Sequence, residues 1–179
     1  MTYSINLKRI LGDLGEQLTA EGEIQMETLT VGDVSFHFRS PVRFDVTFTN
    51  TGGGIVANGT AEATVATECS RCLAEFEMPL VGDVEGFYVQ PDRVEGLPAE
   101  QEFELIEDDK VDVEPAIVAA LAVDAPFAPL HAEECKGICS TCGCDLNTAE
   151  CACEEEPAES PFAVLKEMFG KEGNEGDSK

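Results

Sequence analysis

The chain carries eight cysteines in two groups, and their spacing predicts metal binding. Cys69 and Cys72 form the first group, with two residues between them. The second group lies within residues 135–153 and comprises Cys135, Cys139, Cys142, Cys144, Cys151 and Cys153. Two thiolates on a tight turn can point at one ion, and a tetrahedral zinc site needs two such pairs. The fold must therefore bring cysteine pairs together, and the sequence raises the question of which pairs meet.

The same cysteines would predict disulfides in a secreted chain, so the compartment bears on their chemistry. The N-terminal residues hold no apolar run of the length that a signal peptide needs. No stretch approaches the roughly 18 apolar residues of a membrane span. These features favour a cytoplasmic protein with no membrane segment, whose thiols stay reduced unless a metal binds them. A redox dithiol is the alternative interpretation of Cys69 and Cys72.

Acidic residues outnumber basic ones by 36 to 11, which gives a net charge of −25. A surface this negative repels phosphate, so sequence-independent binding to nucleic acid is disfavoured. A basic protein is the partner that suits this charge, and the alternative interpretation is that the charge serves solubility alone. The sequence holds no glycine-rich phosphate loop and no nucleophile elbow. We therefore expect neither an enzyme nor a small-molecule substrate.

Alternating apolar residues predict the sheet that must position the cysteines. Residues 42–49 alternate between apolar and polar side chains, which is the period of a strand with one buried face. A second β-rich stretch follows at 55–67, and the alternation resumes at 76–80. Residues 22–90 therefore predict an antiparallel meander or a small barrel-like sheet. The fold of residues 1–40 stays open.

The predicted sheet places the first cysteine pair. Cys69 and Cys72 fall between two expected strands, at a hairpin tip or at the rim of the sheet. Residues 91–111 predict an acidic loop, and residues 114–123 predict a short helix that begins after Asp112 as a cap. The predicted fold class is thus α+β: an antiparallel sheet, a few short helices and a C-terminal cysteine-rich metal-binding segment.

We expect the chain to divide into three parts. Residues 1–130 form the sheet core with the N-terminal segment, the acidic loop and the short helix. Residues 131–170 form the cysteine-rich metal-binding segment and a terminal helix, in which Ser160 is the cap and Pro161 lies in the first turn. Residues 171–179 are expected to be a disordered tail.

Two cysteine motifs resemble those of the bacterial and plastid YceD family. The first is Cys69-Ser-Arg-Cys-Leu73, and the second is Cys135-Lys-Gly-Ile-Cys-Ser-Thr-Cys-Gly-Cys-Asp-Leu-Asn147, followed by Cys-Ala-Cys153. With the acidic linker, the short helix and the terminal segment, the resemblance covers nearly the whole chain in the family's order. It implies a role in the accumulation of large-subunit ribosomal RNA, and hence in ribosome assembly.

The resemblance also implies a division of the ligands. Family members often carry a cysteine at the position of His131, and cysteine and imidazole both bind zinc, so His131 and Cys135 could complete a site with the first pair. A second, local site would then be formed by Cys139, Cys142, Cys151 and Cys153. Cys144 is left over as a bystander. A competing division places one zinc on Cys69, Cys72, Cys139 and Cys142 and leaves the other thiols free.

The expected cofactor is zinc, one or two ions in closed structural sites, because four protein ligands leave no position for a reacting water. Three functions remain open. The first is a non-enzymatic, zinc-stabilised assembly factor that acts through a basic ribosomal protein or a precursor particle. The second is direct RNA recognition by zinc knuckles, for which the sequence offers little positive charge in one region: Lys8, Arg9, Arg39 and Arg43. The third is a CxxC thiol redox protein.

Overall fold

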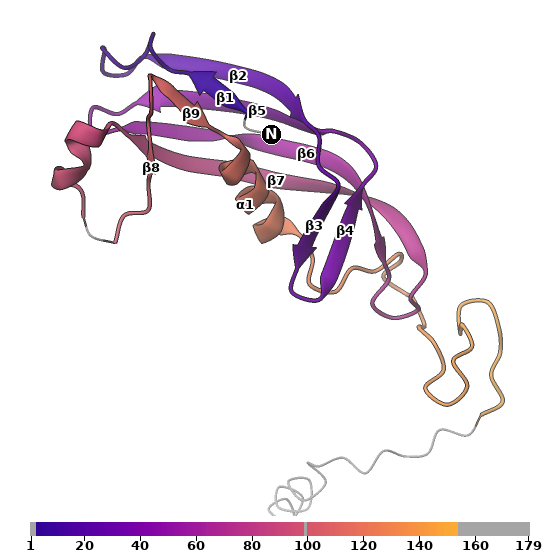
Figure 1. Cartoon of the computed structure of the whole chain (residues 1–179). Coiled ribbons are helices and arrows are strands. Elements are labelled where there is room, and N and C mark those ends of the chain that lie inside the picture. The colour runs from indigo at the N-terminus through magenta and orange to yellow at the C-terminus, as the bar shows by residue number, and fades with distance from the viewer. Residues whose placement is uncertain (1–2, 99, 154–179) are drawn as a thin grey trace, which may run out of the picture.

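The computed structural model describes residues 3–98 and 100–153, and its main feature is a long antiparallel sheet (Figure 1). Its seven strands are β2 (Gln17–Ile24), β3 (Thr28–Val31), β4 (Val34–Phe38), β5 (Val42–Asn50), β6 (Ile55–Glu68), β7 (Glu75–Val89) and β8 (Glu104–Leu105). The other elements are strands β1 (Ser4–Asn6) and β9 (Lys110–Asp112), the 3-10 helix η1 (Pro91–Gly96) and helix α1 (Glu114–Asp124). The predicted fold class is confirmed. The predicted terminal helix and tail, at 160–170 and 171–179, lie outside the described residues.

Strand β6 is the centre of this sheet. Along one edge it pairs with β5 and then, nearer its end, with β4, and along the other edge it pairs with β7 over its whole length. Beyond these neighbours, β2 and β3 extend the first edge and β8 adds a parallel pair to β7. Within the described residues the strand order runs from β2 to β8 without closing. Of the two predicted arrangements, the meander therefore describes the sheet.

The alternation of side chains puts the core on one face of the sheet. In β5, Val42, Phe44, Val46 and Phe48 are buried, while the residues between them are exposed or half-buried. Helix α1 packs on β7 with four buried residues: Ala116, Ile117, Ala120 and Leu121. The opposite face of the sheet carries the polar members of each strand. This one-sided burial is what the period of two in the sequence predicts.

Helix α1 begins at Glu114, as predicted, but its N-cap residue is Val113 and not the predicted Asp112, which lies one residue earlier. Asp112 Oδ1 accepts a hydrogen bond from the backbone N–H of Glu114 at 3.1 Å, and Pro115 lies in the first turn. The same oxygen accepts a hydrogen bond from Tyr3 N at 3.2 Å. Asp112 therefore links the start of the helix to the N-terminal segment.

The sequence prediction was wrong for residues 91–111, which are not one irregular loop. They contain η1, β8 and β9, and β9 pairs with β1 near the start of the chain. Strands of two or three residues are too short to show a period, and their partners are distant in sequence. Local patterns therefore could not reveal them.

The only α-helix in the described part of the chain is α1, which has 11 residues. A bilayer-spanning helix needs about 20 apolar residues. Within residues 3–98 and 100–153, no helix is long and apolar enough to cross a membrane.

The β6–β7 hairpin carries Cys69 and Cys72 at its tip, as predicted. After α1 the chain runs back toward this tip (Figure 1). There the backbone N–H of Ser70 donates a hydrogen bond to Pro129 O at 2.8 Å. The fold thus brings the segment after α1 to the first cysteine pair.

Gly82 in β7 lets α1 lie directly against the sheet. A Cβ atom at this position would lie 2.6 Å from the backbone carbonyl carbon of Ala120 and 2.8 Å from the backbone nitrogen of Leu121. A single backbone atom of a helix cannot move without its neighbours. A larger residue at position 82 must therefore displace the whole helix.

We expect Gly82→Val to lower the free energy of unfolding by about 1–3 kcal/mol, because the added atoms overpack the helix contact. Urea denaturation followed by circular dichroism measures this loss. Gly53→Ala is the control, since a Cβ at Gly53 meets nothing within 4 Å. An unfolding midpoint that is equal for Gly82→Val and wild type would contradict the close packing of α1 on β7.

Candidate metal centre

The turn after β6 holds the sulfur of Cys69 in a frame of backbone N–H groups. The backbone N–H of Leu73 donates to Cys69 O at 2.9 Å and closes the turn. Against the effect of burial, the backbone N–H groups of His131, Cys72 and Arg71 lower the pKa of the Cys69 thiol. Leu73 takes the left-handed backbone conformation, with φ of 62°. This turn brings the sulfurs of Cys69 and Cys72 to the same side.

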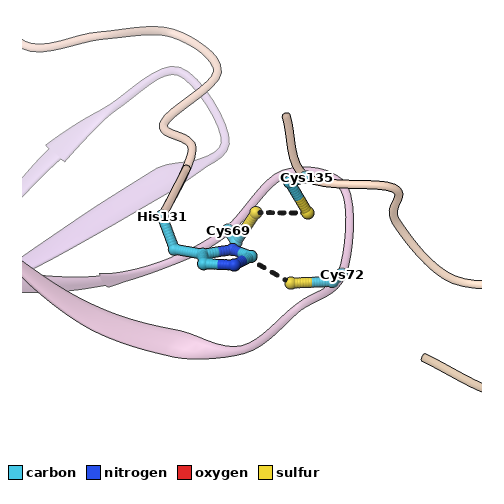
Figure 2. Close-up of side chains that lie close together, drawn as sticks. All are labelled: Cys69, Cys72, His131 and Cys135. Atoms are coloured by element: carbon cyan, nitrogen blue, oxygen red, sulfur yellow. Dashed lines mark hydrogen bonds between the residues drawn. The ribbon is translucent and has the colours of Figure 1, made fainter. Parts of the chain in front are cut away.

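The segment after α1 brings His131 and Cys135 to this turn (Figure 2). The sulfurs of Cys69 and Cys135 lie 3.8 Å apart, and His131 Nδ1 lies 3.4 Å from the sulfur of Cys72. The four possible ligand atoms all lie within 4.8 Å of one another. Cys69 and Cys135 are buried, whereas His131 is at the surface. We call these four residues the first group.

Arg71 joins the hairpin tip, which carries Cys69 and Cys72, to the segment that carries His131 and Cys135. Its Nη1 donates to the backbone carbonyls of Glu133 and Cys135, at 3.1 and 2.9 Å. Its own carbonyl accepts a hydrogen bond from Ile138 N at 3.1 Å. Gly137 lies so close that a Cβ would be 3.0 Å from this carbonyl, and its φ of +76° also favours glycine. Sequence reasoning missed this role of Arg71, although its place between the two cysteines was a signal.

The turn at Cys139 and Cys142 repeats the backbone of the first turn. The N–H of Gly143 donates to Cys139 O at 2.8 Å, and Gly143 has a φ of 73°. The N–H of Thr141 donates to Cys139 Sγ at 3.4 Å. A short antiparallel bridge between Ile138 and Asp145 closes the base of this turn.

A second group forms around this turn. The sulfur of Cys151 lies 3.5 Å from that of Cys142 and 3.4 Å from that of Cys139. The set whose sulfurs all lie within 4.8 Å of one another is Cys139, Cys142, Cys151 and Cys153. These residues and those of the first group are the eight ligands that the sequence analysis predicted. The competing set of Cys69, Cys72, Cys139 and Cys142 is split between the two groups.

The geometry of both groups suits a tetrahedral ion. Two sulfurs that each lie about 2.3 Å from such an ion are about 3.8 Å apart. The sulfur separations above lie at or slightly below this value. All eight cysteines are free of disulfides, and sets of thiolate and imidazole donors suit zinc better than magnesium or calcium. Two groups that could hold metal ions are thus present.

The thiols of the first group differ in acidity because they share one small space. Burial raises the pKa of Cys69, but hydrogen bonds from the backbone N–H groups of His131 and Cys72, among others, bring this pKa down to about 5. For Cys72, the N–H of Ala74 lowers the pKa, but burial and the sulfurs of Cys69 and Cys135 raise it to about 11. One thiolate thus opposes the ionisation of its neighbour. A divalent cation removes this opposition.

The second group shows the same division. The N–H groups of Cys142 and Thr141 lower the pKa of Cys139 to about 6. Hydrogen bonding to the sulfurs of Cys151 and Cys142 raises the pKa of Cys153 to about 12. Each group therefore combines thiols of lowered pKa, Cys69 in the first group and Cys139 and Cys142 in the second, with a thiol of raised pKa.

Cys144, predicted as a bystander, lies against the second group. Hydrogen bonding to the sulfur of Cys142, with burial and the sulfur of Cys151, raises the pKa of Cys144 to about 12. Its thiol therefore keeps its proton and can donate it toward the thiolates of the group. Its sulfur is not one of the four that lie within 4.8 Å of one another.

Asn147 connects the two groups and was missed by sequence reasoning. Its Nδ2 donates to the sulfur of Cys135 at 3.4 Å and to Asp145 Oδ1 at 2.7 Å. Its Oδ1 accepts a hydrogen bond from Lys136 N at 2.8 Å. A residue that follows the second turn thus supports a ligand of the first group. Hydrogen bonds of this kind orient metal ligands and tune their basicity.

Comparison with known proteins finds one family and a few relatives. The family model described as "Large ribosomal RNA subunit accumulation protein YceD" matches residues 57–169. Uncharacterized proteins of Mycobacterium bovis and Mycobacterium tuberculosis are 29% identical to the chain over 122 residues, which is 68% of this chain and 58% of theirs. An uncharacterized protein of Mycobacterium leprae is 25% identical over 114 residues, or 63% of this chain and 52% of that protein. No solved structure matches the chain.

We expect close to two zinc ions per chain in protein purified under reducing conditions, since each group provides four ligands. Cys69→Ser and Cys139→Ser should each lose one ion, and Cys139→Ser should expose residues 135–153 to protease while the sheet stays resistant. Elemental analysis and native mass spectrometry measure the ions. Cys144→Ser is the control and should keep both. A single ion in wild type that either variant removes would favour the competing division.

We expect Arg71→Lys to weaken the first site by roughly 10- to 100-fold, because a lysine cannot reproduce the contact with two carbonyls. Chelator competition, read as the zinc released from the first site, measures this change. Arg9→Lys is the matched control, since the guanidinium of Arg9 also donates to a backbone carbonyl, that of Gln17, at 2.7 Å. Equal zinc retention in Arg71→Lys and wild type would show that the contact does not support the site.

Proposed function

The chain belongs to the YceD family, and from this premise we propose that it promotes the accumulation of large-subunit ribosomal RNA as a zinc-stabilised, non-enzymatic assembly factor. The observation that carries the proposal is the match of the family model over residues 57–169. The chain spans 58% of the length of the Mycobacterium bovis and Mycobacterium tuberculosis relatives and 52% of the Mycobacterium leprae protein. The proposal therefore concerns this chain and not the whole of those proteins.

We assign the metal ions a structural task. Each group supplies four protein ligands, so a tetrahedral ion bound there keeps no open position for water or substrate. Bound zinc would tie the tip of the β6–β7 hairpin to the segment after α1 and would close the second turn. The chemistry that zinc supplies here is the stabilisation of several thiolates in one place.

The distribution of charge favours a basic protein as the partner. On the exposed face of the sheet, Glu21, Asp45, Thr60 and Asp83 lie directly opposite one another across β2, β5, β6 and β7. Like charges in this arrangement destabilise a sheet. This row of residues contains three carboxylates and no cation. The face that carries it therefore attracts a basic surface and repels phosphate. We therefore propose that the chain acts through a basic ribosomal protein or through such a protein within a precursor particle.

Direct RNA recognition is the alternative, and the cations of the described residues give it little support. Arg39 lies 2.8 Å from Glu75 and 3.8 Å from Glu77, and Arg43 lies 3.2 Å from Glu23. These arginines are engaged with carboxylates of the same sheet. A phosphate-binding surface would need cations free of such partners.

We expect the zinc-loaded chain to bind at least one purified basic protein of the large ribosomal subunit, with an affinity that falls as salt rises. Fluorescence anisotropy against individual subunit proteins measures this binding. Electrophoretic mobility of a large-subunit precursor RNA, at moderate salt and without other proteins, is the control and should not change. In cells that lack the chain, the ratio of large- to small-subunit ribosomal RNA should fall.

A shift of the naked RNA together with no binding to any subunit protein would favour direct RNA recognition. Turnover of a disulfide substrate that is lost in Cys69→Ser and in Cys72→Ser would favour the redox function. An unchanged ribosomal RNA ratio in cells that lack the chain would contradict the family-based proposal itself.

A further inference from the structure

A groove of about 400 Å³ lies between the β3–β4 hairpin and the first cysteine turn. Val34 and Leu73 supply apolar lining, while carboxylates are contributed by Asp33, Glu68 and Glu75. The groove is next to the first group but does not contain its four ligand atoms together, because only Cys69 lines it. It therefore offers a surface that the metal function does not use.

Leu73 is unusual on two counts. Its φ of 62° lies in the left-handed region, which favours glycine and strains a branched residue. Its side chain is 60% exposed, although it is a large apolar one. The residue at the same position of the second turn is Gly143, with a φ of 73° and the same backbone hydrogen bond. The turn itself thus has no need of leucine, and glycine would relieve both the strain and the exposure.

The carboxylates of the groove are also arranged at a cost to the free protein. Glu68 and Glu75 are directly opposite each other in the pairing of β6 with β7. Glu75 is bound by Arg39 at 2.8 Å, whereas Glu68 and Asp33 are exposed and form no ion pair with a described residue. Facing carboxylates repel each other. A cation placed in the groove would relieve this repulsion.

We propose that this groove binds a basic segment of a protein, with an apolar side chain against Leu73 and lysine or arginine side chains at Asp33 and Glu68. An exposed apolar side chain beside unpaired carboxylates fits such a segment, since the leucine gains burial and the carboxylates gain partners. RNA does not suit the groove, because its phosphates would face the carboxylates. The identification of the segment as part of a large-subunit ribosomal protein rests on the proposed function.

The test uses the zinc-loaded full chain and, as probes, the labelled subunit proteins that bind wild type. Leu73→Gly should keep both zinc ions and unfold in urea at an equal or higher midpoint, because it removes strain. The same variant should raise the Kd for the subunit protein at least tenfold. Leu14→Gly is the matched control, since Leu14 is 76% exposed and lies outside the groove. That control should leave the Kd unchanged.

The double variant Asp33→Asn with Glu68→Gln tests the charges without touching the turn. It should raise the Kd several-fold at low salt, and the difference should shrink at high salt. A Kd that stays at the wild-type value in both Leu73→Gly and the double variant would contradict binding of the basic segment in this groove, while the proposed function would stand. Failure of every subunit protein to bind wild type overturns the basic partner and the groove together. If Leu73→Gly loses zinc or unfolds, the double variant alone decides.

Discussion

Residues 131–153 are joined to the sheet at one main junction, where Arg71 contacts the chain between Glu133 and Ile138. The side chain and the backbone carbonyl of Arg71 together make three hydrogen bonds to the returning segment, in addition to the bond from Ser70 N–H to Pro129 O. Apolar packing cannot replace this junction, since Cys135 and Gly137 are the only fully buried residues within 131–153. A segment with so small a core needs another source of stability, and metal ligation is the source that small domains use.

The junction also gathers negative charge, which a bound metal ion would offset. A chain with a net charge of −25 collects thiols at two points, and each thiolate adds to the negative charge already there. Backbone N–H groups and the side-chain amide of Asn147 donate to the sulfurs and stabilise part of this negative charge. These dipoles favour the first ionisation in each group but leave its neighbour with a raised pKa. A bound cation would favour the ionisation of the remaining thiols, and the overall negative field attracts cations.

The sequence predicted the parts of the fold that have a period or a local signature. Strands β5, β6 and β7 alternate with a period of two, and α1 follows an aspartate and has a proline in its first turn, so each could be predicted without knowledge of its neighbours. The hairpin position of Cys69 and Cys72 followed from those strands. By contrast, β1, β8 and β9 depend on pairing between segments that are distant in sequence. A strand of two or three residues has no sequence pattern from which its partner strand could be predicted.

The candidate site shows the same limit. Spacing identified the cysteines, but the approach of His131 to Cys72 came from the family resemblance and not from any local pattern. The contacts of Arg71 and Asn147 were missed because both reach across the chain to atoms that only the fold brings near. Side chains that support ligands have no fixed spacing from them, unlike the ligands themselves.

A comparison of the two cysteine turns distinguishes the features that both turns share from a feature found only in the first. Both turns close with the same hydrogen bond, and both place the next residue in the left-handed region, so these features belong to the turn itself. The identity of that residue differs, since one turn has Gly143 and the other has Leu73. The left-handed region costs a non-glycine residue roughly 1–2 kcal/mol, and the exposure of Leu73 brings no compensating burial within the described chain. Proteins retain such costs where a residue acts on something outside the fold. The strain and exposure of Leu73 thus distinguish the first turn from the second, and the proposed groove depends on these two features.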